Sequence, residues 1–211
     1  MTNKIIPTIL VKNKEELMER RTELKKHFSL AQLDVADGKF VPNRSLPLDN
    51  IKRSTLKYEV HLMVKDNLVN IKKALKLHPV SISFHYESCR DEKEIEALIN
   101  FLKRRKIKPG IALHPKTQIL KVKPFLKKVD RIMILGVAPG FSGQKFLPST
   151  INKVKALRKM DRKIIIEVDG GVSDKNIVKL KKAGANLFCL GSYLSGEEMP
   201  ENLKLLKKMI K

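Results

Sequence analysis

The chain has little that could cross-link it or hold it in a membrane. Its 211 residues include two cysteines and no tryptophan. Cys89 and Cys189 stand alone, outside any CxxC pair, so the sequence offers neither a disulfide framework nor a thiolate metal site. No apolar run approaches the ~20 residues that span a bilayer, and residues 1–7 lack the apolar segment of a secretory signal. These absences predict a cytoplasmic protein with no membrane partner.

Acidic residues are scarce relative to basic ones. Only 22 Asp and Glu stand against 44 Lys and Arg, which gives a formal charge of +22. Such a charge favours a polyanionic partner such as a nucleic acid, but the lysines are spread along nearly every predicted helix instead of forming one stripe with interleaved aromatics. A solvated cationic surface that attracts anionic metabolites explains this pattern better. We therefore expect no nucleic-acid partner, with a polyanion contact as the alternative.

Short β-branched runs alternate eight times with segments whose apolar residues recur every three or four positions. The pattern predicts strands near residues 5–10, 29–35, 58–64, 80–86, 110–113, 131–137, 163–168 and 186–190, and helices near 14–26, 48–53, 68–77, 91–105, 118–128, 148–159, 174–183 and 200–210. No linker divides the chain, so we expect a single domain over residues 1–211, an α/β fold closed as a (β/α)8 TIM barrel. A doubly wound open sheet is the alternative, but no glycine-rich dinucleotide turn follows the first strand.

The alternation of side chains along the strands places polar groups inside this barrel. The residues expected to face the axis are Gln32, Asp34, Glu59, His61, Met63, Ser83, His85, Glu87, Glu167 and Asp169. Branched apolar residues normally fill a barrel interior, and burying an unpaired carboxylate there is costly. Polar residues at the strand ends, namely Asp34, His61 and Asp169, therefore indicate a functional site. The deeper Glu59 and Glu167 are expected to belong to a hydrogen-bonded structural network.

Asp34 and Asp169 end strands that we expect on opposite sides of the barrel mouth. Two carboxylates on opposite faces of a carbon next to a carbonyl can take and return its proton, as a two-base epimerisation requires. Together with His61 they also form a set of two carboxylates and one imidazole, which suits a first-row divalent ion. Such an ion would offset the charge of an enediolate.

Glycine-rich segments follow three of the strands. Gly170-Gly171 and Gly191-Ser192 end the seventh and eighth strands, where barrels of this type commonly bind phosphate through backbone N–H groups. Residues 139–146, PGFSGQKF, follow the sixth strand. We expect this segment to be a mobile cover over the site, with a tight turn before a helix as the alternative.

Four motifs together resemble the ribulose-phosphate 3-epimerase family: LDVADGKFVPN at 33–43, VHLMV at 60–64, PGFSGQKF at 139–146 and EVDGGV at 167–172. The resemblance extends from Pro7 to Ser192. It implies a barrel of the ribulose-phosphate-binding type and an isomerase of the pentose phosphate pathway. Its implied reaction interconverts D-ribulose 5-phosphate and D-xylulose 5-phosphate through a metal-stabilised enediolate.

The same resemblance implies roles for individual residues. Asp34 and Asp169 resemble the two acid/base carboxylates, and with His61 they resemble the ligands of a divalent metal such as Zn, Mn, Fe or Co. Met63 resembles a methionine that packs against the enediolate. The implied substrate-binding residues are Thr8, His61, Met63, Gly140, Phe141, Ser142, Gly143, Gly170, Gly171, Gly191 and Ser192.

The chain departs from the family around the reacting centre. Gln32 stands where the family usually has a histidine ligand, and an amide oxygen is a poorer ligand than imidazole, so weak metal binding is expected. Thr8 replaces a serine, while Ala36 and Leu135 replace methionines, which predicts a roomier roof over the substrate. Two alternatives therefore stay open: an epimerase of another ketose phosphate, such as a hexulose 6-phosphate, and a non-catalytic phosphosugar-binding homologue. A homo-oligomer that uses Phe125, Leu126 or Ile210 is also an open alternative.

Overall fold

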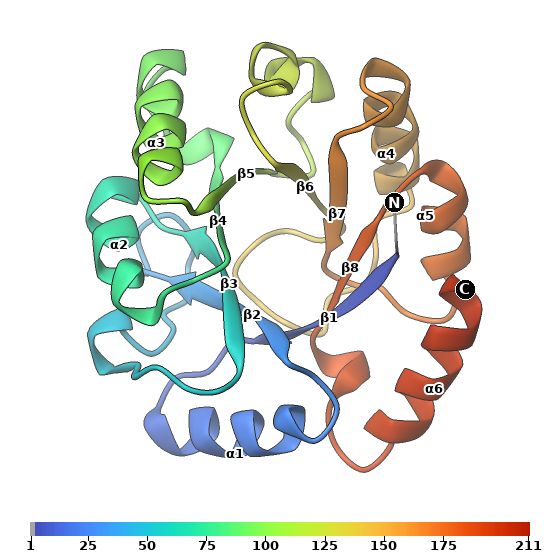
Figure 1. Cartoon of the computed structure of the whole chain (residues 1–211). Coiled ribbons are helices and arrows are strands. Elements are labelled where there is room, and N and C mark those ends of the chain that lie inside the picture. Colours follow the sequence, from blue (N-terminus) through green and yellow to red (C-terminus); the bar gives the residue numbers. More distant parts are fainter. Residues whose placement is uncertain (1–2) are drawn as a thin grey trace.

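Eight parallel strands form a closed barrel in chain order in the computed structural model, which describes residues 3–211 (Figure 1). The strands are β1 (Lys4–Ile9), β2 (Leu30–Ala36), β3 (Lys57–Met63), β4 (Ser81–His85), β5 (Lys108–Leu113), β6 (Arg131–Leu135), β7 (Ile165–Asp169) and β8 (Leu187–Leu190). The predicted (β/α)8 fold class is confirmed, and every strand end lies within about two residues of its predicted position. The assignment of residues 1–211 to one domain stays a prediction.

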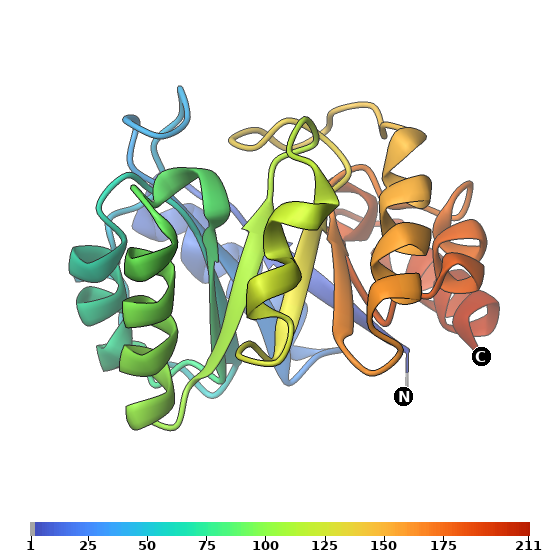
Figure 2. The same ribbon diagram turned by 90° about the horizontal axis from the view of Figure 1, so that it is seen from above.

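Helices surround the barrel on its outside (Figures 1 and 2). The α-helices are α1 (Lys14–Lys25), α2 (Asn67–Ala74), α3 (Glu92–Arg104), α4 (Ser149–Met160), α5 (Ile177–Ala183) and α6 (Met199–Ile210). The 3-10 helices are η1 (Leu48–Asn50), η2 (Leu75–Leu77), η3 (Tyr86–Ser88), η4 (Ile119–Phe125) and η5 (Ser192–Leu194). Within residues 3–211, no helix is both long enough and apolar enough to cross a membrane.

Two local predictions need correction. The segment expected as a helix near residues 118–128 forms only the 3-10 helix η4, because Pro124 lies inside it and cannot donate a backbone hydrogen bond. Strand β4 ends at His85, so Tyr86 and Glu87 lie in η3 and do not continue the alternation of the strand.

Local sequence signals set where the longer helices begin. Asn13 caps α1 by accepting a hydrogen bond from the Glu16 N–H at 2.8 Å, and the Glu16 carboxylate accepts from the Lys12 N–H at 2.8 Å. Asp91 and Glu94 repeat this reciprocal arrangement at the start of α3. Each capping box provides acceptors for backbone N–H groups that would otherwise lack partners. This determines the residue at which the helix begins.

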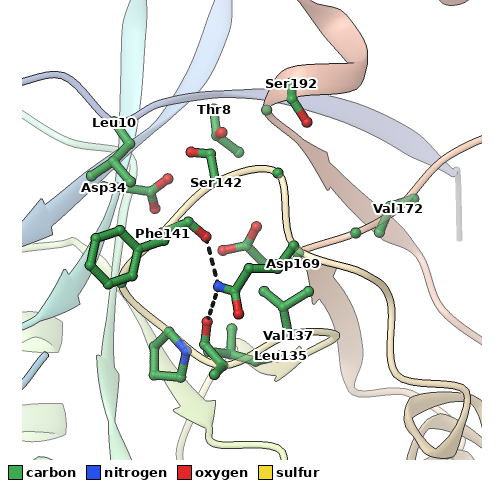
Figure 3. Close-up of a pocket in the computed structure, with 18 of the residues that line it drawn as sticks. Thr8, Leu10, Asp34, Leu135, Val137, Phe141, Ser142, Asp169, Val172 and Ser192 are labelled. Atoms are coloured by element: carbon green, nitrogen blue, oxygen red, sulfur yellow. Dashed lines mark hydrogen bonds between the residues drawn. The ribbon is translucent and has the colours of Figure 1, made fainter. Parts of the chain in front are cut away.

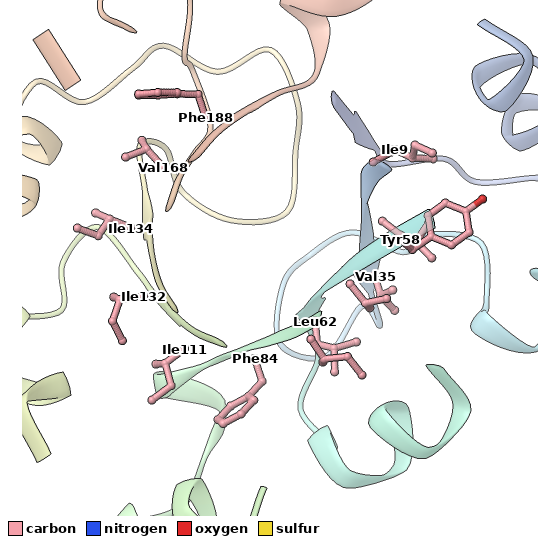
Figure 4. Packing of buried hydrophobic residues seen from close by; sticks show 14 of the residues in the cluster. Ile9, Val35, Tyr58, Leu62, Phe84, Ile111, Ile132, Ile134, Val168 and Phe188 are labelled. Atoms are coloured by element: carbon pink, nitrogen blue, oxygen red, sulfur yellow. The ribbon is translucent and has the colours of Figure 1, made fainter. Parts of the chain in front are cut away.

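The main apolar core lies between the barrel and the helices. Branched and aromatic residues of the strands point outward into it, including Val35, Leu62, Phe84, Ile132 and Val168, as Figure 4 shows. Phe125, Leu126 and Ile210 are buried in this same core. These three residues are therefore covered within one chain, which argues against their use in an interface, and a homo-oligomer stays a prediction.

A buried ion pair fills the floor of the barrel. Arg131 Nη1 of β6 lies 2.7 Å from Glu59 Oε2 of β3 and 3.1 Å from Glu167 Oε2 of β7. Burial and the neighbouring Glu167 raise the pKa of Glu59 well above its usual value. Burial also opposes the charge of Glu167, but the Arg131 guanidinium and the hydrogen bonds with Glu59 and Cys189 together outweigh it and lower the pKa of Glu167. The predicted structural network around these two glutamates is present, and its cation is Arg131.

We expect Arg131→Met to lower the free energy of unfolding by roughly 3–5 kcal/mol, because it leaves two carboxyl groups buried without their cation. Urea unfolding followed by circular dichroism measures this change. The triple variant Arg131→Met, Glu59→Gln, Glu167→Gln should regain most of the loss, since amides carry no charge. A single variant as stable as the natural chain would contradict the assignment of Arg131 as the stabilising cation.

Candidate active site

A cavity with about 620 Å³ of empty space opens at the carboxyl ends of the strands. Its walls come from β1, β2, β3, β6 and β7 and from the residues that follow β1, β6, β7 and β8. The cavity gathers all the residues implied as catalytic or substrate-binding: Thr8, Asp34, His61, Met63, Gly140, Phe141, Ser142, Gly143, Asp169, Gly170, Gly171, Gly191 and Ser192. Sequence patterns thus found the residues that meet here, while their individual roles stay predictions.

Asp34 and Asp169 reach this cavity from β2 and β7. Figure 3 shows both carboxylates pointing into it. The two strands are not diametrically opposite as expected, since only β8 and β1 lie between them on the shorter way round the barrel. His61 of β3 joins the two acids, with its Nδ1 at 3.0 Å from Asp34 Oδ1 and 3.3 Å from Asp169 Oδ2.

The charges of these groups depend on one another. Burial raises the pKa of Asp34 to about 6, against the opposing effect of its hydrogen bond with His61. Burial alone would lower the pKa of His61, but its hydrogen bonds to Asp169 and Asp34 raise it to about 10. Asp34 therefore changes its protonation state near neutral pH, while His61 stays a cation between the two acids.

A second histidine supports His61 from behind. His61 Nε2 lies 3.0 Å from His85 Nε2, and His85 Nδ1 lies 3.3 Å from Glu87 Oε2. Burial lowers the pKa of His85 to about 4, so this imidazole is neutral and its Nε2 accepts a hydrogen bond from the protonated His61. His85 does not line the cavity. The hydrogen bond between the two imidazoles orients His61.

Gln32 lies beneath the two acids and is fully buried. Its Nε2 donates to Asp34 Oδ1 at 2.8 Å and to Asp169 Oδ2 at 2.9 Å, while its Oε1 accepts from Cys189 Sγ at 3.1 Å. Burial raises the pKa of Cys189 well above its usual value, which keeps it a protonated thiol. Contrary to expectation, Gln32 does not present its oxygen to a metal, because an amide N–H faces the acids and offers no lone pair.

Three of the expected metal ligands do come together. Single ligand atoms of Asp34, His61 and Asp169 all lie within 4.8 Å of one another. Two carboxylates and one imidazole suit a first-row divalent ion, and three protein ligands leave a coordination position for a water or substrate oxygen. Glu59, Glu167 and Cys189 also cluster, but Arg131 already supplies the cation there.

One end of the cavity is built of glycine backbone. Gly171 has φ of +67°, and a Cβ on it would lie 2.8 Å from the Phe146 Cα. A Cβ on Gly191 would lie 2.9 Å from Thr8 Oγ1. No lysine or arginine of residues 3–211 lines this cavity. An anionic group held here would therefore be bound by backbone N–H groups and hydroxyls, and the +22 charge of the chain lies elsewhere.

Residues 139–144 of the segment after β6 line the cavity, and the role of residues 139–146 as a mobile cover stays a prediction. Gln144 Nε2 donates to the carbonyl oxygens of Ala138 at 2.7 Å and Phe141 at 2.9 Å, which closes the segment on itself (Figure 3). Asn43 Nδ2 donates to the Gly140 carbonyl at 2.5 Å and joins the cover to the loop after β2. In Figure 2 both loops project from the same end of the barrel. The motif at 33–43 contained Asn43, but nothing in the sequence indicated its partner.

The expected roof is only partly present. Leu135 lines the cavity, whereas Ala36 does not. Ala36 packs instead with Val41 and Met63 in a small apolar cluster. The extra space expected from the loss of two methionine side chains therefore concerns the Leu135 position alone.

Comparisons with known proteins agree with this geometry. Residues 4–195 match the ribulose-phosphate 3 epimerase family. The chain is 39% identical over 176 residues to ribulose-phosphate 3-epimerase from Buchnera aphidicola, covering 78% of this chain and 75% of that protein. It is 34% identical over 186 residues to the cytoplasmic isoform from rice, covering 84% and 81%.

Solved structures show the same fold at low sequence identity. A 3-keto-L-gulonate-6-phosphate decarboxylase from Vibrio cholerae superposes with a TM-score of 0.73 at 11% identity, covering 100% of this chain and 98% of that one. A 3-hexulose-6-phosphate synthase superposes with a TM-score of 0.74 at 14% identity, covering 99% and 100%. These likenesses concern the barrel alone.

We expect Gly171→Ala to abolish binding of inorganic phosphate, because its Cβ would collide with the Phe146 backbone and open the glycine-lined end. A phosphorus NMR titration measures this binding. Gly196→Ala is the matched control, since Gly196 also has a positive φ of +73° but a Cβ there would meet nothing within 4 Å. Equal phosphate binding by both variants would show that this end of the cavity does not hold the anion.

We also expect a pH-dependent contribution from Glu87. Burial opposes its charge, but the hydrogen bonds from His85 and from the His114 N–H lower its pKa to about 2. The stabilisation is therefore complete above the ordinary value of 4.5 and is lost as the pH falls towards 2. Urea unfolding should show Glu87→Gln less stable by roughly 1–2 kcal/mol at about pH 6, with a smaller difference at about pH 3. A difference that does not change with pH would contradict this account.

Proposed function

Because the chain belongs to the ribulose-phosphate 3-epimerase family, we propose that it interconverts D-ribulose 5-phosphate and D-xylulose 5-phosphate. It is then an isomerase of the pentose phosphate pathway, with a sugar phosphate as its substrate. A cytoplasmic location belongs to the same proposal, in keeping with the name of the rice relative.

The observation that carries the proposal is the meeting of Asp34 and Asp169 in one cavity. Both carboxylates lie within hydrogen-bond distance of a single buried amide nitrogen, that of Gln32, although they come from strands far apart in the sequence. A carbon held between them would face an acid/base group on each side. One carboxylate takes the C3 proton and the other returns a proton to the opposite face, which inverts that centre. The pKa of about 6 suits Asp34 to both tasks near neutral pH.

The remaining residues of the cavity orient the substrate. The backbone of Gly170, Gly171 and Gly191 and the hydroxyl of Ser192 hold the phosphate, which places the sugar along the axis toward the two acids. Met63 and Leu135 present apolar surface to the planar intermediate. The cover at residues 139–146 excludes water from the carbanion-like intermediate once substrate is bound.

A divalent ion fits the donor set of Asp34, His61 and Asp169. When bound, it supplies Lewis-acid stabilisation of the negative charge on the substrate oxygens. Zn, Mn, Fe and Co are all compatible with two carboxylates and an imidazole. His61 must give up its Nδ1 proton to serve as a ligand, so binding of the ion is coupled to proton release.

We expect Asp34→Asn and Asp169→Asn each to slow the conversion of ribulose 5-phosphate into xylulose 5-phosphate at least ~1,000-fold, because an amide can neither take the C3 proton nor return one. Proton NMR of ribulose 5-phosphate incubated in deuterated water measures both the conversion and the exchange of the C3 proton. Asp174→Asn, at the same end of the barrel but outside the cavity, is the control and should exchange at the natural rate.

Three results would contradict the proposal in different ways. Conversion at the natural rate in Asp34→Asn would show that this residue is not one of the two acid/base groups. Faster turnover of a hexulose 6-phosphate than of ribulose 5-phosphate would favour an epimerase for the longer substrate. Tight binding of ribulose 5-phosphate without any exchange would favour a phosphosugar-binding protein that has lost catalysis.

A further inference from the structure

Gln32 occupies the centre of the site although it does not line the cavity. It is fully buried, and its amide nitrogen lies 2.8 Å from Asp34 Oδ1 and 2.9 Å from Asp169 Oδ2. A primary amide has two N–H donors, so one can serve each carboxylate. Two acidic groups that would otherwise repel each other thus share one neutral residue as their donor.

The orientation of this amide is determined from below. Cys189 Sγ lies 3.1 Å from Gln32 Oε1 and 3.1 Å from Glu167 Oε1, so the one S–H of the thiol is shared between these two acceptors. Glu167 is in turn held by Arg131. Turning the amide by 180° would set its oxygen against two carboxylate oxygens, which only accept when ionised, and would take from the thiol one of its two acceptors. The contacts on both sides therefore favour the same orientation.

We propose that Gln32 is a positioning residue that holds Asp34 and Asp169 at one point without a metal ion, and that Cys189 fixes the orientation of its amide. The inference rests on the proposed function, because it assigns Gln32 to the placement of the two acid/base groups. It also limits the cation site to three protein ligands, since an N–H group faces the carboxylates at the position where a fourth ligand would stand. The acids are then in place before any ion binds.

The first test uses Co²⁺ alone, whose visible absorption reports the number and type of its ligands. Gln32→Met keeps the length of the side chain and removes its donors and its oxygen, so we expect the spectrum of the natural protein. Gln32→His adds an imidazole, so we expect a changed spectrum and an affinity at least ~10-fold higher. A spectrum of Gln32→Met that reports one protein oxygen ligand fewer than in the natural protein would show that the Gln32 oxygen is a ligand and would overturn the inference.

The second test separates positioning from packing by C3 proton exchange with ribulose 5-phosphate. We expect Gln32→Met and Cys189→Ala to lower kcat at least ~10-fold with KM unchanged, because the glycine-lined end is untouched. Cys189→Ser keeps a donor to Gln32 Oε1 and should stay within about twofold of the natural rate. Ser81→Ala, a buried substitution in β4 away from the cavity, is the control for packing and should have no effect.

The outcomes keep the two proposals apart. Natural kcat in both Cys189→Ala and Gln32→Met would overturn the positioning role, whatever the substrate. Equal losses in Cys189→Ala and Cys189→Ser would show that sulfur packing matters and the donated hydrogen bond does not, which overturns the role of Cys189. If the natural protein exchanges no C3 proton, the proposed function fails, while the Co²⁺ spectra still decide which end of the amide faces the acids.

Discussion

Two pairs of carboxylates lie inside the barrel, and each pair is stabilised by hydrogen-bond donors from another strand. The rest of the structure depends on this arrangement. At the floor, Arg131 lies between Glu59 and Glu167. At the mouth, His61 and Gln32 lie between Asp34 and Asp169. Without these donors the repulsion and the cost of burial would push each pair apart or protonate it. The two layers are joined, because Cys189 contacts both Glu167 of the lower layer and Gln32 of the upper one.

Most of the fold follows from patterns that a single sequence carries. Eight repeats of strand and helix signals, with polar residues at alternate strand positions, predicted the barrel and the inward groups at its carboxyl end. The role of Arg131 as the cation between Glu59 and Glu167 was not predicted, because an arginine in an apolar strand does not indicate which distant acids it will contact. The hydrogen bond from Asn43 to the Gly140 carbonyl was not predicted for the same reason, since these two residues are 97 positions apart in the sequence. The direction of the Gln32 amide depends on Cys189, whose register beside Asp169 exists only in the closed barrel.

The charge of the chain and the chemistry of the cavity are separate features. The excess of 22 positive charges lies outside the cavity, whose lining among residues 3–211 contains no lysine or arginine. A cationic surface raises the local concentration of an anionic substrate and speeds its encounter. On the proposed function, final binding of the phosphate would fall to glycine backbone, where N–H groups approach the oxygens closely and no flexible cation has to be ordered. Selectivity would then come from shape at the glycine-lined end, and attraction from the surface.

An amide and an imidazole at position 32 would hold the two acids in different ways. A neutral imidazole could donate only one N–H toward them, and it would gain or lose a proton with pH. An amide donates to both acids at once and carries no charge at any pH at which the protein is folded. Its oxygen must then find a donor of its own, and in this barrel that donor is the thiol of Cys189. An amide at position 32 therefore depends on Cys189 for its orientation, so the two residues are best understood as one unit of the site.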